Sequence, residues 1–213
     1  MPLTLIALAT VGLSTSAPLE YAASTSLLSA QRQLRAGDRG RALATLDSLL
    51  FTNGVSVAIE KPSGFDESVA QGLDRWNESL GEKIFRFAPI GEEDVTVKFV
   101  RSVDQGGGDA QGFIEAKREM SWSDRSHSYR LHATIFVRDN LYGRSVRADE
   151  VVAIVAHEAG HLLGLADIDR DDRLMGPLMA GHPHDGPADE EVAAVRTYRA
   201  AIRDAYPKRV DKR

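Results

Sequence analysis

The chain has 213 residues, 43% hydrophobic and 27% charged, which is typical of one globular domain with at most a short appendage. Its net charge of −5 argues against nucleic acid as the main partner, because nucleic-acid-binding proteins usually present a basic face. The absence of cysteine excludes disulfides, thiolate zinc ligands and a cysteine nucleophile.

The N-terminus begins with an apolar run over residues 3–13, followed by small residues up to Ala17. This pattern predicts a signal peptide within residues 1–22, and therefore a secreted or exported protein. A cytoplasmic location stays open, because the first basic residue is Arg32 and the run has no positive charge before it. No stretch of 18 apolar residues is present, so we expect no stable membrane span.

Residues 23–50 are predicted to form a helical hairpin or a pro-segment. Apolar residues recur at helical spacing from Leu27 to Leu50, with a break at residues 36–38. The segment resembles one helix–turn–helix unit of the tetratricopeptide type. Because a single unit of that kind cannot bury its own apolar face, we expect it either to pack on the rest of the chain or to be a pro-segment.

Residues 51–213 are predicted to form the main domain. Apolar alternation predicts strands at 55–59, 84–87, 95–99, 112–117 and 131–137, with a glycine-rich loop at 105–109. Helical periodicity predicts helices at 66–80, 150–163 and 189–206, the second of them capped by Asp149. This order indicates an α+β or α/β domain built on one twisted sheet.

The second of these helices carries the motif H-E-x-x-H as His157-Glu158-Ala159-Gly160-His161. Histidines four residues apart share one face of a helix, so their imidazoles can reach a single Zn²⁺ ion. Glu158 follows the first histidine and would lie beside the metal without binding it. That is the position of a general base for a metal-activated water.

The third metal ligand is predicted to be Asp167. A catalytic zinc needs three protein ligands, and Gly164 can end the helix and turn the chain back toward the histidines. His182 and His184 are alternative third ligands from a later loop. A second zinc site at His127 and His132, and a calcium site among the aspartates that follow Gly164, are further alternatives; the usual reading of both sets is solvated surface side chains.

The extended string H-E-x-x-H-x-x-G-x-x-D resembles the zinc signature of the metzincin metallopeptidases, a minority of which carry Asp at the last position. Eight residues after Asp167, Leu174-Met175-Gly176-Pro177 resembles the Met-turn of the matrixin branch. The resemblance implies an α+β fold in which a twisted mixed β-sheet carries an active-site helix and a C-terminal helix. It also implies that 112–117 is the edge strand over the cleft, where extended substrate pairs.

The sequence therefore predicts a zinc-dependent endopeptidase acting on a protein or peptide substrate. His157, His161 and Asp167 would hold Zn²⁺, and Glu158 would act as the catalytic general base. The alternative is a catalytically inactive zinc-binding or protein-interaction module. Glu158 favours catalysis, because a purely structural zinc site has no use for that acid.

Overall fold

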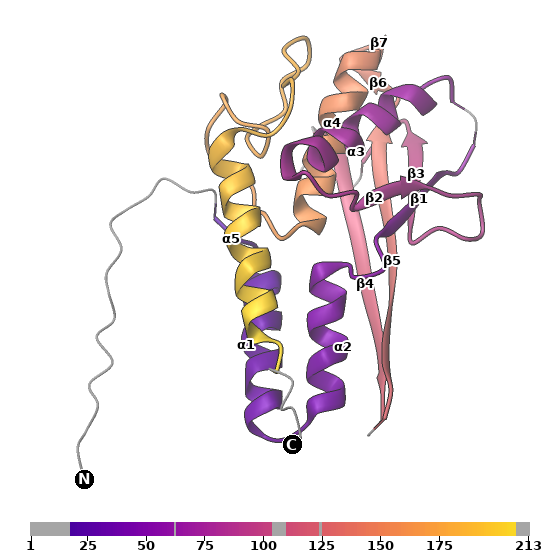
Figure 1. The fold of residues 1–213 in the computed structure, drawn as a ribbon. Coiled ribbons are helices and arrows are strands. Elements are labelled where there is room, and N and C mark those ends of the chain that lie inside the picture. The colour runs from indigo at the N-terminus through magenta and orange to yellow at the C-terminus, as the bar shows by residue number, and fades with distance from the viewer. Residues whose placement is uncertain (1–17, 62, 104–109, 124, 208–213) are drawn as a thin grey trace.

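The computed structural model describes residues 18–61, 63–103, 110–123 and 125–207 (Figure 1). Most of the predicted signal peptide and the predicted glycine-rich loop at 105–109 lie outside these residues. The helices are α1 (Tyr21–Arg35), α2 (Arg39–Leu50), α3 (Asp66–Leu80), α4 (Ala148–Leu162) and α5 (Asp189–Ala205). The strands are β1 (Val55–Ile59), β2 (Phe85–Phe87), β3 (Val95–Val100), β4 (Gly112–Trp122), β5 (His127–Arg138), β6 (Asn140–Leu141) and β7 (Arg144–Ser145).

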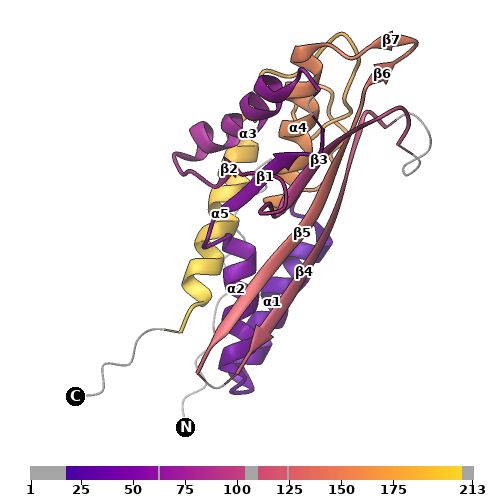
Figure 2. The same ribbon diagram turned by 90° about the vertical axis from the view of Figure 1, so that its right-hand side faces the viewer.

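Five strands form one mixed sheet in the order β2-β1-β3-β5-β4. β1 is parallel to β2 and β3, β3 is parallel to β5, and β4 runs antiparallel to β5 at the edge. The helices lie on one side of this sheet (Figure 2). From Leu131 to Val137, alternate residues of β5 are buried, as expected for a strand with one covered face.

The predicted α+β class with a mixed sheet is confirmed, and the predicted ends of α3 are correct. Gly81 ends that helix in the left-handed conformation, with φ of 70°. The predicted cap of α4 is wrong, because Arg147 precedes the helix and Asp149 lies in its first turn. The structure also has a small β6–β7 hairpin that the apolar pattern did not predict, and longer β4 and β5 strands.

Helix α4 packs against α3 and also against β4 and β5 of the sheet. The Trp76 indole on α3 donates a hydrogen bond to the Ala156 carbonyl of α4 over 2.7 Å. At Gly72 of α3, a Cβ atom would lie 2.7 Å from the Val152 carbonyl oxygen, so only glycine permits this approach. Helix α4 is therefore fixed on two sides before it reaches the motif at its C-terminal end.

The predicted helical hairpin is formed by α1 and α2, which pack on the rest of the chain. Helix α2 lies along the lower halves of β4 and β5, and α1 lies beside α5 (Figure 1). Tyr198 of α5 donates a hydrogen bond to the Ala23 carbonyl of α1 over 3.0 Å. These elements share a second apolar cluster, whose buried members are Ala23, Ala30, Leu46, Leu49, Leu50, Tyr198 and Ile202.

Within the described residues, none of the helices combines the length and the apolar character that crossing a membrane requires.

Candidate metal centre

Two backbone carbonyls fix the orientation of both motif histidines. His157 Nδ1 lies 2.7 Å from the Leu174 carbonyl oxygen, and His161 Nδ1 lies 2.9 Å from that of Leu165. Because a carbonyl can only accept, each Nδ1 carries the proton and donates it. Each Nε2 therefore faces the turn that follows α4, where it can bind a metal ion when it carries no proton.

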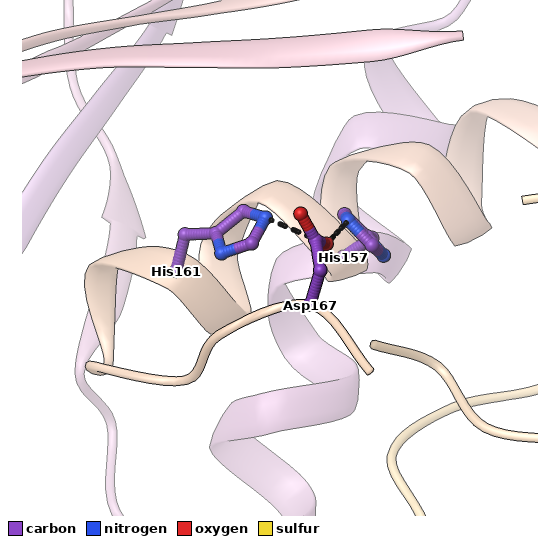
Figure 3. A group of neighbouring side chains, drawn as sticks. All are labelled: His157, His161 and Asp167. Carbon is purple, nitrogen blue, oxygen red and sulfur yellow. Dashed lines mark ion pairs between the residues drawn. The ribbon is translucent and has the colours of Figure 1, made fainter. Parts of the chain in front are cut away.

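That turn brings Asp167 to the two histidines. Gly164 adopts a φ of 95°, and a Cβ atom there would lie 2.9 Å from the Tyr198 ring. The Asp167 Oδ1 atom lies 3.1 Å from His157 Nε2 and 3.4 Å from His161 Nε2 (Figure 3). Gly164 thus satisfies both the backbone conformation and the tight packing that the turn requires.

His157, His161 and Asp167 could together hold a metal ion. One ligand atom from each lies within 4.8 Å of the others. Across the described parts of the chain, no other group of three His, Asp or Glu side chains meets this condition. The two histidines are largely buried, whereas the Asp167 side chain is 74% exposed and faces the solvent side of the centre.

Electrostatic attraction holds the three side chains together. Hydrogen bonds from His157 and His161 lower the pKa of the Asp167 carboxyl below its usual range. Burial disfavours the charged form of His161, but the hydrogen bond with Asp167 and the charge of Glu158 outweigh it and raise the pKa to about 9. A divalent cation bound by the three side chains would displace the proton that the histidines share with Asp167.

Met175 packs against Gly160 of α4 and is fully buried. Its sulfur occupies the space where a side chain at Gly160 would begin. The Met175 amide donates to the Glu191 carboxylate over 2.7 Å, and its carbonyl accepts from the Ile168 amide over 2.9 Å. These bonds tie the Met175 segment to α5 and to the turn that carries Asp167.

Glu158 lies in the same cleft as the three candidate ligands, and only 3% of it is exposed. The cleft has a volume of about 570 Å³. At Gly112, the first residue of β4, a Cβ atom would lie 2.7 Å from Glu158 Oε1, so glycine lets the strand pass close to the carboxylate. Burial raises the pKa of the Glu158 carboxyl, although the two histidines oppose this shift.

The alternative ligands are not part of this group. Neither His182 nor His184 belongs to it, and His184 lines a separate hollow beside α3. His127 Nε2 lies 2.9 Å from Asp47 Oδ2. His132 is five residues further along β5 and so points to the opposite face, which does not favour a shared metal site.

The aspartates that follow Gly164 do not gather around a common point in the described structure. Asp172 is instead paired with Arg170 and Arg173. The carboxylate is therefore already neutralised by two guanidinium groups, as expected for surface charges.

Two residues of the cleft were missed by the sequence reasoning. Gln111 donates a hydrogen bond from Nε2 to the Leu178 carbonyl over 2.6 Å, which ties the start of β4 to the loop after Met175. Glu20 lines the cleft from the segment before α1. Neither residue belongs to a motif, and both reach the site only through the tertiary fold.

No protein-family model matches the chain, and no curated protein matches it. Any assignment of function therefore rests on the residues of the site.

Proposed function

We propose that this protein is a zinc-dependent endopeptidase of the metzincin type, similar to the matrixins. The observation that carries the proposal is the convergence of His157, His161 and Asp167 beside the buried carboxylate of Glu158, in one cleft. The position of Met175 beneath Gly160 supports the same reading. The mixed sheet, with its antiparallel edge strand, is compatible with a metzincin-like fold.

The donor set fits zinc. Two neutral imidazole nitrogens and one carboxylate oxygen form a three-ligand site of the kind that catalytic zinc uses. Both imidazoles are fixed by second hydrogen bonds to carbonyls, which is how zinc-binding histidines are usually oriented. Zinc bound there would polarise the scissile carbonyl and lower the pKa of the attacking water.

Glu158 supplies the proton transfers. Its carboxylate accepts the proton that the attacking water loses, and then delivers that proton to the leaving amine. Both steps use one carboxyl group, so a pKa above the usual glutamate value serves the reaction. Glu158 is buried on α4 against Gly112 of β4, and this burial raises the pKa of its carboxyl in that direction.

Substrate would bind in extended form along β4. This strand pairs with β5 on one side, and among the described residues it has no strand on the other. A free edge can take an added strand through backbone hydrogen bonds, which gives affinity without requiring one sequence. The close approach of Gly112 to Glu158 would place the substrate backbone next to the proposed base.

The test is digestion of casein and of a quenched fluorescent peptide by the zinc-loaded protein, with and without a chelator. We expect cleavage that the chelator abolishes and that added zinc restores. Glu158→Gln should retain zinc, measured by mass spectrometry, and lose about 10²–10⁴-fold in turnover. Glu78→Gln, on the exposed face of α3, is the matched control and should behave like the wild type.

Retained zinc with no hydrolysis by the wild type would favour the inactive zinc-binding module instead.

A further inference from the structure

A short strap formed by residues 18–20 runs beside the turn that carries Asp167. The Glu20 amide donates to the Gly164 carbonyl over 2.8 Å, and the Ala166 amide donates to the Pro18 carbonyl over 3.0 Å. Leu19 and Leu165 form an antiparallel bridge between these bonds. The strap also leads directly into α1, so the backbone of Glu20 is fixed on both sides.

The Glu20 side chain projects into the cleft beside the metal centre. Its side chain is 39% exposed, and Oε1 lies 3.5 Å from His161 Nδ1. That nitrogen already donates to the Leu165 carbonyl over 2.9 Å, so it satisfies little of the carboxylate's capacity to accept hydrogen bonds. Glu20 therefore lies on the far side of the His161 ring from Asp167.

No Lys or Arg of the described chain pairs with Glu20 at close range. Among the described residues, its carboxylate has no Lys or Arg nitrogen within 4.0 Å; the His161 imidazole, 3.5 Å away, attracts it when protonated, and Arg118 attracts it from further away. Glu20 is also the one charged side chain among the described residues that line the cleft, apart from Glu158 and the candidate ligands. The apolar side chains of that lining are Ala110, Phe113, Ile114, Ile168, Pro177 and Leu178.

We propose that Glu20 binds a cationic group of the substrate on the His161 side of the scissile bond, and so determines specificity. The inference rests on the proposed peptidase function and names the substrate class for the same site. The cation can be the side chain of a Lys or Arg residue or the free amino terminus of a short peptide. Both present N–H donors with a positive charge, which form the strongest hydrogen bonds to a carboxylate.

The position of Glu20 suits this role better than a solvated surface position would. Its carboxylate is half-buried in a largely apolar cleft, where an ion pair is screened less by water and salt than at an open surface. Its backbone is held by the strap, so little ordering is needed when a substrate cation arrives. An anionic side chain at the same place would be repelled.

The experiment compares cleavage of one N-acetylated peptide series in which Lys, or the uncharged isostere norleucine, is placed at each position around the scissile bond. For wild-type zinc protein we expect kcat/KM to be about 10-fold or more higher for Lys than for norleucine at one position. In Glu20→Gln this ratio should fall to within about 2-fold of unity, whereas Glu78→Gln, on the exposed face of α3, should keep the wild-type ratio. Repeating the series with free amino termini shows whether the terminus or the side chain supplies the cation.

A binding measurement separates this inference from the proposed function. Fluorescence anisotropy of the same labelled peptides on Glu158→Gln protein should show the preference for Lys, and adding Glu20→Gln should remove it. If the wild type cleaves no peptide but this binding preference is present, the peptidase proposal fails and the cation subsite stands. An equal loss for Lys and norleucine peptides in Glu20→Gln, or loss of zinc from it, would overturn the inference and make Glu20 a positioning residue for His161.

Discussion

Gly160, which lies between the two histidines in the sequence of α4, packs against the side chain of Met175. Alanine has the higher helix propensity, by up to about 1 kcal/mol, so an exposed site would gain from Gly→Ala. Here the added methyl would overlap the Met175 side chain and also crowd Trp76. We expect Gly160→Ala to destabilise the protein by about 1–3 kcal/mol in chemical denaturation.

The control for this prediction is a double-mutant cycle. Met175→Ala removes the overlapping sulfur, so Gly160→Ala should cost less in that background than in the wild type. Equal costs in the two backgrounds would mean that the methionine does not set the requirement for glycine.

Asp167 is the least certain of the candidate ligands from the motif alone, because most members of the family that the motif resembles carry histidine at this position. Its Oδ1 nevertheless lies within hydrogen-bonding or ion-pair reach of both Nε2 atoms. We expect Asp167→Ala to weaken zinc binding by more than about 10–100-fold, which is the loss typical when a residue that only supports a ligand is removed. Competition with a chromophoric chelator measures the zinc affinity. His184→Ala is the control and should bind zinc like the wild type, because His184 lies outside the group.

At the scale of elements, Glu150 joins three segments around the N-terminus of α4. Arg144 of β7 donates to Glu150 Oε2 over 2.8 Å, and the backbone amides of Arg147 and Gly181 donate over 2.9 and 2.7 Å. The Arg144 hydrogen bond lowers the pKa of the Glu150 carboxyl to about 2. Glu150 therefore fixes the start of the helix that ends at the metal centre.

The lowered pKa gives a stability change with a definite sign. A folded-state pKa of about 2, against an ordinary value of 4.5, means that the unfolded chain binds more protons between these values. The stabilisation by Glu150 is therefore full above pH 4.5 and is lost as the pH falls toward 2. We expect Glu150→Gln to lower the free energy of unfolding at pH 7 by about 1.5–3 kcal/mol.

This difference between Glu150→Gln and wild type should narrow from pH 4.5 to pH 2 in urea titrations. Asp149→Asn is the neighbouring control, since Asp149 forms an exposed ion pair with Arg147 and accepts a local hydrogen bond from the Glu150 amide. If the difference in unfolding free energy between the two proteins stayed constant with pH, stability would not be linked to protonation of the Glu150 carboxyl.

The ends of α3 and the positions of the candidate ligands could be read from local patterns. The apolar spacing and Gly81 define the helix 66–80, and the histidine spacing with Gly164 places the ligands near one another. The lower halves of β4 and β5 could not be found in this way. Their residues Glu119 and Arg130 are polar on the outward face, and the pairing of the two strands with α2 is long-range.

For the molecule as a whole, the helical hairpin shares an apolar cluster with α5, the C-terminal helix of the proposed catalytic part. Leu46 of α2 is fully buried in the cluster that also contains Tyr198 and Ile202 of α5. We expect Leu46→Ala to destabilise the protein by about 2–5 kcal/mol, in a single unfolding transition that also includes the metal centre. Leu28→Ala is the control, because Leu28 is 53% exposed and should change stability little.

An early transition that left zinc binding intact would show instead that the hairpin unfolds independently.

The edge position of β4 has a consequence for how copies of the protein behave toward one another. A long edge strand left open for substrate is also a template on which a second copy could add its own strand, the first step toward aggregation. Charged residues alternate along the outward face of β4, at Glu115, Lys117 and Glu119. Such charges disfavour edge-to-edge pairing of β4 with the β4 strand of a second copy. The edge can therefore stay open to a peptide substrate without promoting aggregation of the protein.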